Sequence, residues 1–217
     1  LIEDGRNVLI LEADSRIGGR IQSDLVDGFI LDRGFQVLQT AYPEARTALD
    51  YEKLMLHPFL PGVAVRVGGR FHLIADPVRR PQELWSTLTS PIGTISDRFR
   101  MLKLFAENRL KGSDGIFSSP DIPAAEFLKS YCFSDRIIER FFRPFFAGAS
   151  LDPEIRASSR VFRYLFNIFA SGDATLPEKG MGAIPDQLAD VIPKDRIQLN
   201  SRVRSIEQGR VALAAGQ

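Results

Sequence analysis

The chain has few of the residues that mark several common classes of protein. Cys132 is the single cysteine among 217 residues, which excludes an internal disulfide. His57 and His72 are the only histidines, and neither has a companion at a spacing typical of metal ligands, so no metal site is expected. The formal net charge of +1 gives no support for a nucleic-acid partner. Since no run of about 18 apolar residues occurs, no helix is expected to span a membrane.

The most informative stretch that is present lies near the start of the chain. Residues 8–11 (Val-Leu-Ile-Leu) predict a buried strand that ends on Glu12, and Gly18-Gly19 follows between Arg16 and Arg20. A carboxylate at the C-terminal end of a strand can accept both hydroxyls of a ribose. Glycines let a backbone approach a pyrophosphate, and arginines offset its charge. The pattern therefore predicts a site for the ADP half of a dinucleotide.

The usual partner of such an acid is not visible in the sequence. In a dinucleotide-binding unit the acid lies about 20 residues after a glycine-rich phosphate turn, which here would precede Leu1. The opening residues 1–5 resemble the last turn of a helix closed by Gly5. We therefore expect the sequence to be a fragment. It would lack the first strand and the phosphate loop before Leu1, and it would also lack a flavin-contacting segment that follows Gln217.

Four stretches carry a resemblance to a known family. Residues 11–23, with Glu12 and the Arg-Ile-Gly-Gly-Arg run, resemble the FAD-binding segment of the flavin amine oxidase, protoporphyrinogen oxidase and phytoene desaturase superfamily. Residues 28–36 resemble the strand and turn that reach the flavin in that family. Residues 177–185 resemble its Gly-Met turn, and residues 197–206 its adenine-contacting strand pair.

The resemblance implies a non-covalently bound FAD and a role for each matching residue. Glu12 would hold the ribose, Gly18 and Gly19 would pass under the pyrophosphate, and Arg16 and Arg20 would face the phosphates. The isoalloxazine ring would lie along Gly34, Phe35, Gln36 and Val37, and the backbone of Val203 would meet the adenine. Arg33 precedes Gly34 where amine oxidases usually carry a second glycine, which favours the desaturase-like branch and weakens a transfer of amine substrates.

The pattern of the chain predicts an α/β fold interrupted by a helical insert. We expect a Rossmann-like FAD-binding part over residues 1–56, a largely helical α+β substrate or cap domain over 57–176, and a return to the FAD-binding part over 177–217. No internal repeat is present.

The expected elements follow from glycine turns and from apolar spacing. Hairpins are predicted at Asp27-Gly28, Gly68-Gly69 and Gln208-Gly209. Helical stretches are expected at 42–53, 81–110, 122–128, 135–142, 161–171 and 183–191. A surface loop is expected over 112–123, and Pro144 is expected to interrupt its helix.

Two compositional features leave alternatives open. The 16 phenylalanines, most of them after residue 99, fit either a phenylalanine-rich core or a wide apolar cavity for a lipophilic substrate. A set of arginines among the phenylalanine-rich helices fits either a solvated helix face or contact with an acidic substrate or with anionic lipid headgroups. The arginines of this set are Arg140, Arg143, Arg156, Arg160 and Arg163.

The function predicted from the sequence is an FAD-dependent oxidoreductase that removes two electrons from a small, apolar molecule by desaturation or by amine-oxidase-like chemistry. The alternatives are a nicotinamide-dependent Rossmann enzyme and a non-catalytic flavoprotein relic. The expected partner is a small molecule, with peripheral membrane contact as a further option. The catalytic residues, the oligomeric state and the choice between a cytoplasmic and an organellar location stay open.

Overall fold

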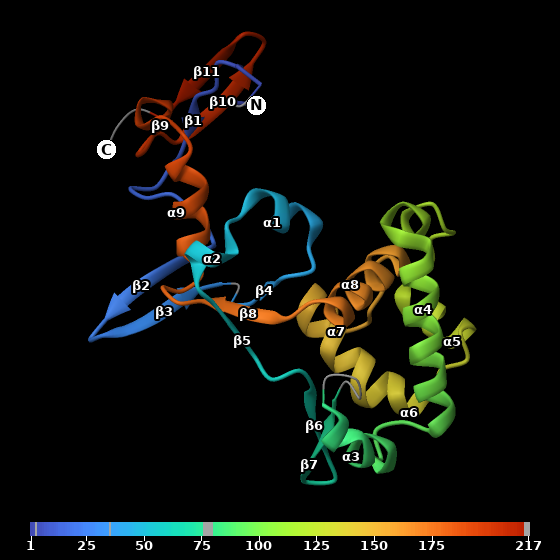
Figure 1. Cartoon of the computed structure of the whole chain (residues 1–217). Coiled ribbons are helices and arrows are strands. Elements are labelled where there is room, and N and C mark those ends of the chain that lie inside the picture. Colours follow the sequence, from blue (N-terminus) through green and yellow to red (C-terminus); the bar gives the residue numbers. More distant parts are fainter. Residues whose placement is uncertain (3, 35, 76–79, 215–217) are drawn as a thin grey trace. The chain divides into compact units, whose positions relative to one another are not determined.

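The computed structural model describes residues 1–2, 4–34, 36–75 and 80–214, and its contacts divide the chain into two compact units (Figure 1). Unit 1 joins residues 1–59 with 174–217, and unit 2 comprises residues 60–173. The domain boundaries at 56/57 and 176/177 stay a prediction. Within the described ranges, no helix has both the length and the apolarity needed to cross a bilayer.

Unit 1 is an α/β body of short elements. Its strands are β1 (Ile10–Leu11), β2 (Gln22–Val26), β3 (Phe29–Arg33), β4 (Leu38–Gln39), β5 (Leu56–Pro58), β8 (Ala174–Pro177), β9 (Ile197–Gln198), β10 (Val203–Glu207) and β11 (Arg210–Leu213). Its helices are α1 (Pro43–Ala48), α2 (Tyr51–Leu54) and α9 (Ala183–Asp190). The strand pair β1–β9 is parallel, β2–β3 and β10–β11 are antiparallel hairpins, and a small antiparallel sheet has the order β4-β8-β5.

Unit 2 is largely helical. Its elements are the hairpin β6 (Val63–Val67) and β7 (Arg70–Ile74), and the helices α3 (Leu84–Thr89), α4 (Ile95–Phe117), α5 (Ala124–Ser130), α6 (Asp135–Ile137), α7 (Arg143–Ser150) and α8 (Ser159–Ser171). A π-helical turn, Ile138–Phe142, connects α6 to α7.

The phenylalanines of unit 2 form its core. Phe142 is fully buried, and its ring lies edge-on to Phe133 at a centroid distance of 4.9 Å. The ring centroids of Phe146 and Phe162 are 4.5 Å apart. These rings pack against one another in the interior of unit 2. Of the two alternatives that the sequence left open, the phenylalanine-rich core therefore accounts for these residues.

The structure confirms the elements that local turn chemistry predicts. All three hairpins form, with Asp27-Gly28, Gly68-Gly69 and Gln208-Gly209 between their strands. The residues of the second pair have φ values of 58° and 81°, which glycine adopts without a steric penalty. Helix α8 ends at Ser171, where the predicted helical stretch 161–171 ends, and Gly172 follows it as the C-cap.

Several predicted boundaries are wrong for identifiable reasons. The single helix expected over 42–53 is two helices, because Leu49 is extended and the Asp50 side chain caps α2 by accepting from the Lys53 N–H. The helical stretch over 81–110 likewise divides into α3 and α4, with Pro91 between them. The strand predicted over 8–11 is only Ile10–Leu11, and Leu9 is 54% exposed rather than buried.

Two further expectations about helix ends are also wrong. The surface loop expected from residue 112 begins later, because α4 continues to Phe117 across Gly112, whose φ of 64° marks a kink. Pro144 does not interrupt its helix. It lies in the first turn of α7, directly after the π-helical turn Ile138–Phe142, so the chain stays helical through it.

Asp97 joins two helix starts in the interior of unit 2. Its buried carboxylate accepts hydrogen bonds from the backbone N–H and side-chain hydroxyl of both Thr94 and Ser134, at 2.6 to 2.9 Å. Thr94 caps α4 and Ser134 caps α6. Burial raises the pKa of Asp97, but these hydrogen bonds outweigh burial and hold the pKa below its usual range.

We predict that Asp97→Asn lowers the free energy of unfolding by about 2–4 kcal/mol, because an amide nitrogen would face the donors of Ser134 or Thr94. Since the folded-state pKa is lowered, the contribution of the charge is complete above about pH 5 and declines as the pH falls below about 4. Urea unfolding at pH 7 and pH 3.5 measures both effects. Asp114→Asn, at an exposed position of α4, is the matched control. An unfolding energy for Asp97→Asn equal to that of the control would contradict the prediction.

Candidate functional site

Glu12 lies where β1 ends, held by the returning chain. Its backbone N–H donates to the Gln198 carbonyl at 2.9 Å, and its carbonyl accepts from the Ser201 N–H at 2.7 Å. The side chain is half-buried, and its Oε1 accepts from the Asp14 N–H at 2.8 Å. The carboxylate is therefore oriented by the backbone that follows it, at the C-terminal end of a parallel strand pair.

The two glycines of the following loop differ in their surroundings. Gly18 has a φ of 106°, and a Cβ there would lie 2.5 Å from the Ile21 carbonyl oxygen, so the turn itself requires glycine. Gly19 has a φ of 54° and no atom within 4 Å of a Cβ position. Gly18 closes the bend, whereas Gly19 presents bare backbone to an open space.

The two arginines of the loop are also unequal. Arg16 donates to Asp24 at 2.6 Å and to the Ser23 carbonyl at 3.3 Å, and Arg33 also contacts Asp24. Hydrogen bonds from Arg33 and Arg16 hold the pKa of Asp24 below its usual range. Arg20 is exposed, and the described part of the chain provides no ion-pair partner for it. Arg16 thus stabilises the loop through its hydrogen bonds, and the Arg20 side chain remains available to bind an anion.

The end of the β2–β3 hairpin approaches the same loop. Gly34 has a φ of 79°, and a Cβ there would lie 2.8 Å from the Arg20 carbonyl oxygen. Gln36 is exposed and Val37 is half-buried, whereas Phe35 lies outside the described residues. The structure therefore brings Gly34 against the backbone of Arg20. The predicted contact of residues 34–37 with the flavin ring stays a prediction.

Val203 begins β10, two residues beyond the Ser201 N–H that bonds to Glu12. It is 38% exposed and pairs with Leu213 in the hairpin. The chain thus passes from the Glu12 ladder directly into the strand predicted to meet the adenine.

A polar lock holds the Gly-Met turn against the β2–β3 hairpin. Ser23 Oγ donates to Asp32 Oδ1 at 2.5 Å and accepts from the Gly182 N–H at 2.8 Å, and Asp32 Oδ1 also accepts from the Met181 N–H at 2.9 Å. At Gly180 a Cβ would lie 2.6 Å from Ser23 Oγ and 2.8 Å from Asp32 Oδ1. The glycines allow this approach, and Asp32 organises the turn.

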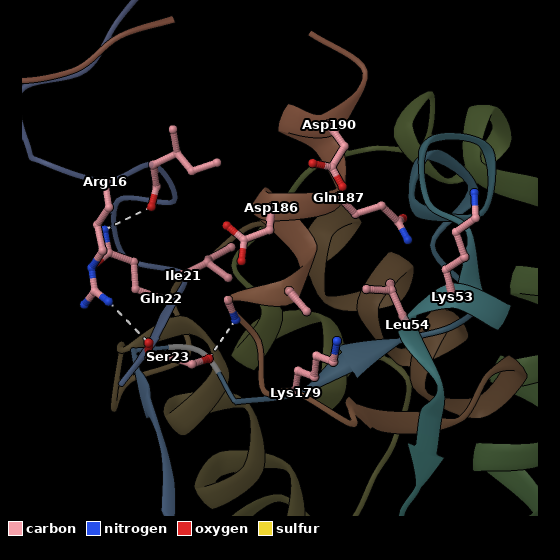
Figure 2. A pocket seen from close by; sticks show the side chains of 13 residues that line it. Arg16, Ile21, Gln22, Ser23, Lys53, Leu54, Lys179, Asp186, Gln187 and Asp190 are labelled. Atoms are coloured by element: carbon pink, nitrogen blue, oxygen red, sulfur yellow. Dashed lines mark hydrogen bonds between the residues drawn. The ribbon is translucent and has the colours of Figure 1, made fainter. Parts of the chain in front are cut away.

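Sequence reasoning missed a pocket of about 420 Å³ within unit 1. Figure 2 shows Lys53 of α2, Lys179, and Asp186, Gln187 and Asp190 of α9 around it. Of the predicted cofactor residues that the structure describes, only Arg16 lines the pocket. The hollow therefore does not coincide with the Glu12 site, although the predicted Gly-Met turn, through Gly182, forms part of its wall.

Most of the other side chains considered from the sequence contact protein groups. His57 pairs with Glu178, and the described residues hold no group of side chains arranged for a metal ion. Four of the five arginines named among the phenylalanine-rich helices donate hydrogen bonds to protein groups. Their acceptors are the Pro91 carbonyl for Arg140, Glu139 for Arg143, the Ser119 carbonyl for Arg160 and Asn108 for Arg163. The fifth, Arg156, is 77% exposed and lies 3.8 Å from Asp152, as a solvated position would.

Comparison with known proteins gives a consistent family. The family model described as flavin-containing amine oxidoreductase matches residues 1–217. A curated relative, protoporphyrinogen oxidase 2, chloroplastic/mitochondrial, from Arabidopsis thaliana, is 25% identical over 241 residues, which cover 93% of this chain and 46% of the relative.

Solved structures share the fold. Cyclohexylamine oxidase from Brevibacterium oxydans IH-35A matches with a TM-score of 0.64 and 19% identity, covering 100% of this chain and 51% of that chain. Reduced UDP-galactopyranose mutase matches with a TM-score of 0.55 and 18% identity, covering 100% and 49%. The chain thus spans about half the length of the proteins it matches, and at such identities the likeness extends to the fold alone.

The polar lock predicts a contrast between two glycines with left-handed backbones. Gly180→Ala adds a Cβ against Ser23 and Asp32, whereas Gly209→Ala, at a φ of 76°, meets no atom within 4 Å. We expect the first change to cost about 2–4 kcal/mol of unfolding free energy and the second about 1 kcal/mol, because only the first combines strain with overlap. Chemical denaturation measures both, and equal losses would argue against a tight turn.

Proposed function

Because this chain belongs to the flavin-containing amine oxidoreductase family, we propose that it supplies part of the FAD site and the substrate unit of an FAD-dependent oxidoreductase. The observation that carries the proposal is the orientation of the Glu12 carboxylate at the end of the β1–β9 pair, beside a loop with an open glycine and an unpaired arginine. The nicotinamide-dependent alternative has no support from the family.

The residues present fit the ADP half of FAD. Within the described residues, Oε1 of Glu12 accepts from the Asp14 N–H and Oε2 has no protein donor, so the carboxylate keeps acceptor capacity for a ribose diol. Gly19 offers backbone without a Cβ, as a pyrophosphate neighbour requires. Arg20 offers a guanidinium that can bind a phosphate through two parallel hydrogen bonds.

When bound, FAD would supply two-electron redox chemistry, and the protein would supply binding and orientation. In this proposal Glu12 holds the sugar, Arg20 offsets the phosphate charge, and Gly34 with Gln36 and Val37 borders the ring. Ser23 and Asp32 contribute by fixing the Gly-Met turn on the hairpin that carries Gly34. Val203 would meet the adenine through its backbone.

The substrate class follows less directly. A small organic molecule oxidised at a C–C or C–N bond fits the family, and Arg33 before Gly34 favours the desaturase-like branch. The phenylalanines of unit 2 no longer argue for a lipophilic cavity, because the buried ones fill the core against one another.

Removal of the carboxylate tests the proposed ribose contact. We expect Glu12→Ala, made in the protein as its gene encodes it, to weaken FAD binding about ten- to hundredfold, since a charge-assisted hydrogen bond contributes about 1.5–3 kcal/mol. Titration of the apoprotein with FAD, followed by flavin fluorescence, measures the affinity. Glu44→Ala, at an exposed acid of α1, is the matched control. FAD affinity unchanged in Glu12→Ala would refute the proposed role.

The two loop arginines give a second, independent test. Arg20→Ala is expected to weaken FAD binding about tenfold with little change in the stability of the apoprotein, because its side chain has no ion-pair partner within the described residues. Arg16→Ala should instead lower the thermal stability of the apoprotein, because it frees Asp24 and the Ser23 carbonyl. The reverse pattern would assign the phosphate contact to Arg16.

A further inference from the structure

Arg163 is a buried cation on α8 whose position is determined by two neighbouring helices. Its side chain is only 6% exposed. Its Nε donates to Asn108 Oδ1 of α4 at 2.9 Å, and Asn108 Nδ2 donates back to the Arg163 carbonyl at 3.3 Å. The guanidinium carbon lies 5.5 Å from the centre of the Phe127 ring of α5. The guanidinium is therefore oriented before any ligand arrives.

The acid that precedes Asn108 on α4 does not neutralise this cation. Glu107 accepts a hydrogen bond from the Tyr131 hydroxyl at 3.0 Å and lies 3.7 Å from Lys103. Within the described ranges, Arg163 has no ion pair with any carboxylate. Because a buried charge is normally paired, the missing counter-charge calls for an explanation.

The outer edge of the guanidinium is unpaired but not sealed. Nη1 and Nη2 have no acceptor among the described residues, and both keep contact with solvent. Asn167 follows one helical turn later on the same side of α8, and its Oδ1 is buried without a donor. The amide nitrogen of Asn167 has no acceptor in the described part of the chain either. Two neighbouring side chains thus hold unused donors.

The arrangement of these donors favours a carboxylate. The two outer nitrogens of a guanidinium match the two oxygens of a carboxylate through parallel hydrogen bonds. One guanidinium balances the single charge of a carboxylate, whereas a phosphate dianion would keep a second charge, because Lys103 already faces Glu107. The Phe127 ring beside the guanidinium suits an apolar body behind the carboxylate.

We propose that Arg163 and Asn167 bind a carboxylate of the small molecule that unit 2 receives. Arg163 donates through Nη1 and Nη2, Asn167 donates through its amide nitrogen, and Asn108 positions the guanidinium. This inference rests on the proposed function, in which unit 2 is the substrate unit, and it restricts the substrate class to organic acids.

Isothermal titration calorimetry of the protein as its gene encodes it tests the proposal, with benzoate as the probe and neutral benzamide as its isosteric control. We expect benzoate to bind and benzamide to bind at least about tenfold more weakly. Arg163→Gln should lower the benzoate affinity at least about tenfold. The matched control Arg156→Gln, at a 77% exposed position, should leave it unchanged. Circular dichroism confirms the fold of each variant.

Asn167→Asp keeps the test decisive if Arg163→Gln fails to fold. The carboxylate that this change introduces lies one turn from Arg163 and would pair with it, so benzoate binding should be lost while the fold is kept. Equal benzoate binding by either folded variant would overturn the proposal. So would tighter binding of inorganic phosphate with the same dependence on Arg163.

Absence of benzoate binding to the unchanged protein would also overturn the proposal, and an acid from another part of the natural protein that already pairs with Arg163 would produce that result. Titration of the same sample with FAD separates this inference from the proposed function. Benzoate binding without FAD binding would contradict the proposed function, whereas FAD binding without benzoate binding would contradict the carboxylate site alone.

Discussion

The backbone ladder between residues 10–14 and 197–201 is the constraint on which the candidate site depends. It joins two passages of chain that are separated by the whole of unit 2, through the parallel pairing of β1 with β9 and the bonds from Glu12 to Gln198 and from Ser201 to Glu12. Parallel strands need a long crossover, and here the crossover contains a complete second unit. The orientation of Glu12 therefore depends on the return of residues 197–201 to β1 as well as on the local motif.

The Arg-Ile-Gly-Gly-Arg motif separates into a supporting part and an open part. Arg16 and Gly18 are committed to the loop itself, the first through Asp24 and the second through the close approach of the Ile21 carbonyl. Gly19 has no atom within 4 Å of a Cβ position, and the described residues offer no ion-pair partner to the Arg20 side chain. Such a division suits a binding loop, because rigid support determines where the unpaired groups point. The two glycines and the two arginines of this motif therefore have different roles, although they are residues of the same type.

Sequence reasoning succeeded where the determinant is local and failed where it is tertiary. The Gly68-Gly69 hairpin follows from turn chemistry, and the family could be inferred from residues 11–23 because close backbone approach demands particular residue types. The division of the predicted helix 42–53 at Leu49 depends on the Asp50 side chain, which caps α2. The sequence did not reveal this division, because the residues on both sides of it favour a helix. The partner of Arg16 could not be foreseen, because Asp24 joins it only when the chain folds back.

The most direct test of the account is a crystal structure of the natural protein with its cofactor bound. The account predicts FAD, with both ribose hydroxyls of its adenosine half within hydrogen-bond distance of the Glu12 carboxylate and its diphosphate beside Gly19. A carboxylate directed into bulk solvent, or a nicotinamide dinucleotide in place of FAD, would contradict it.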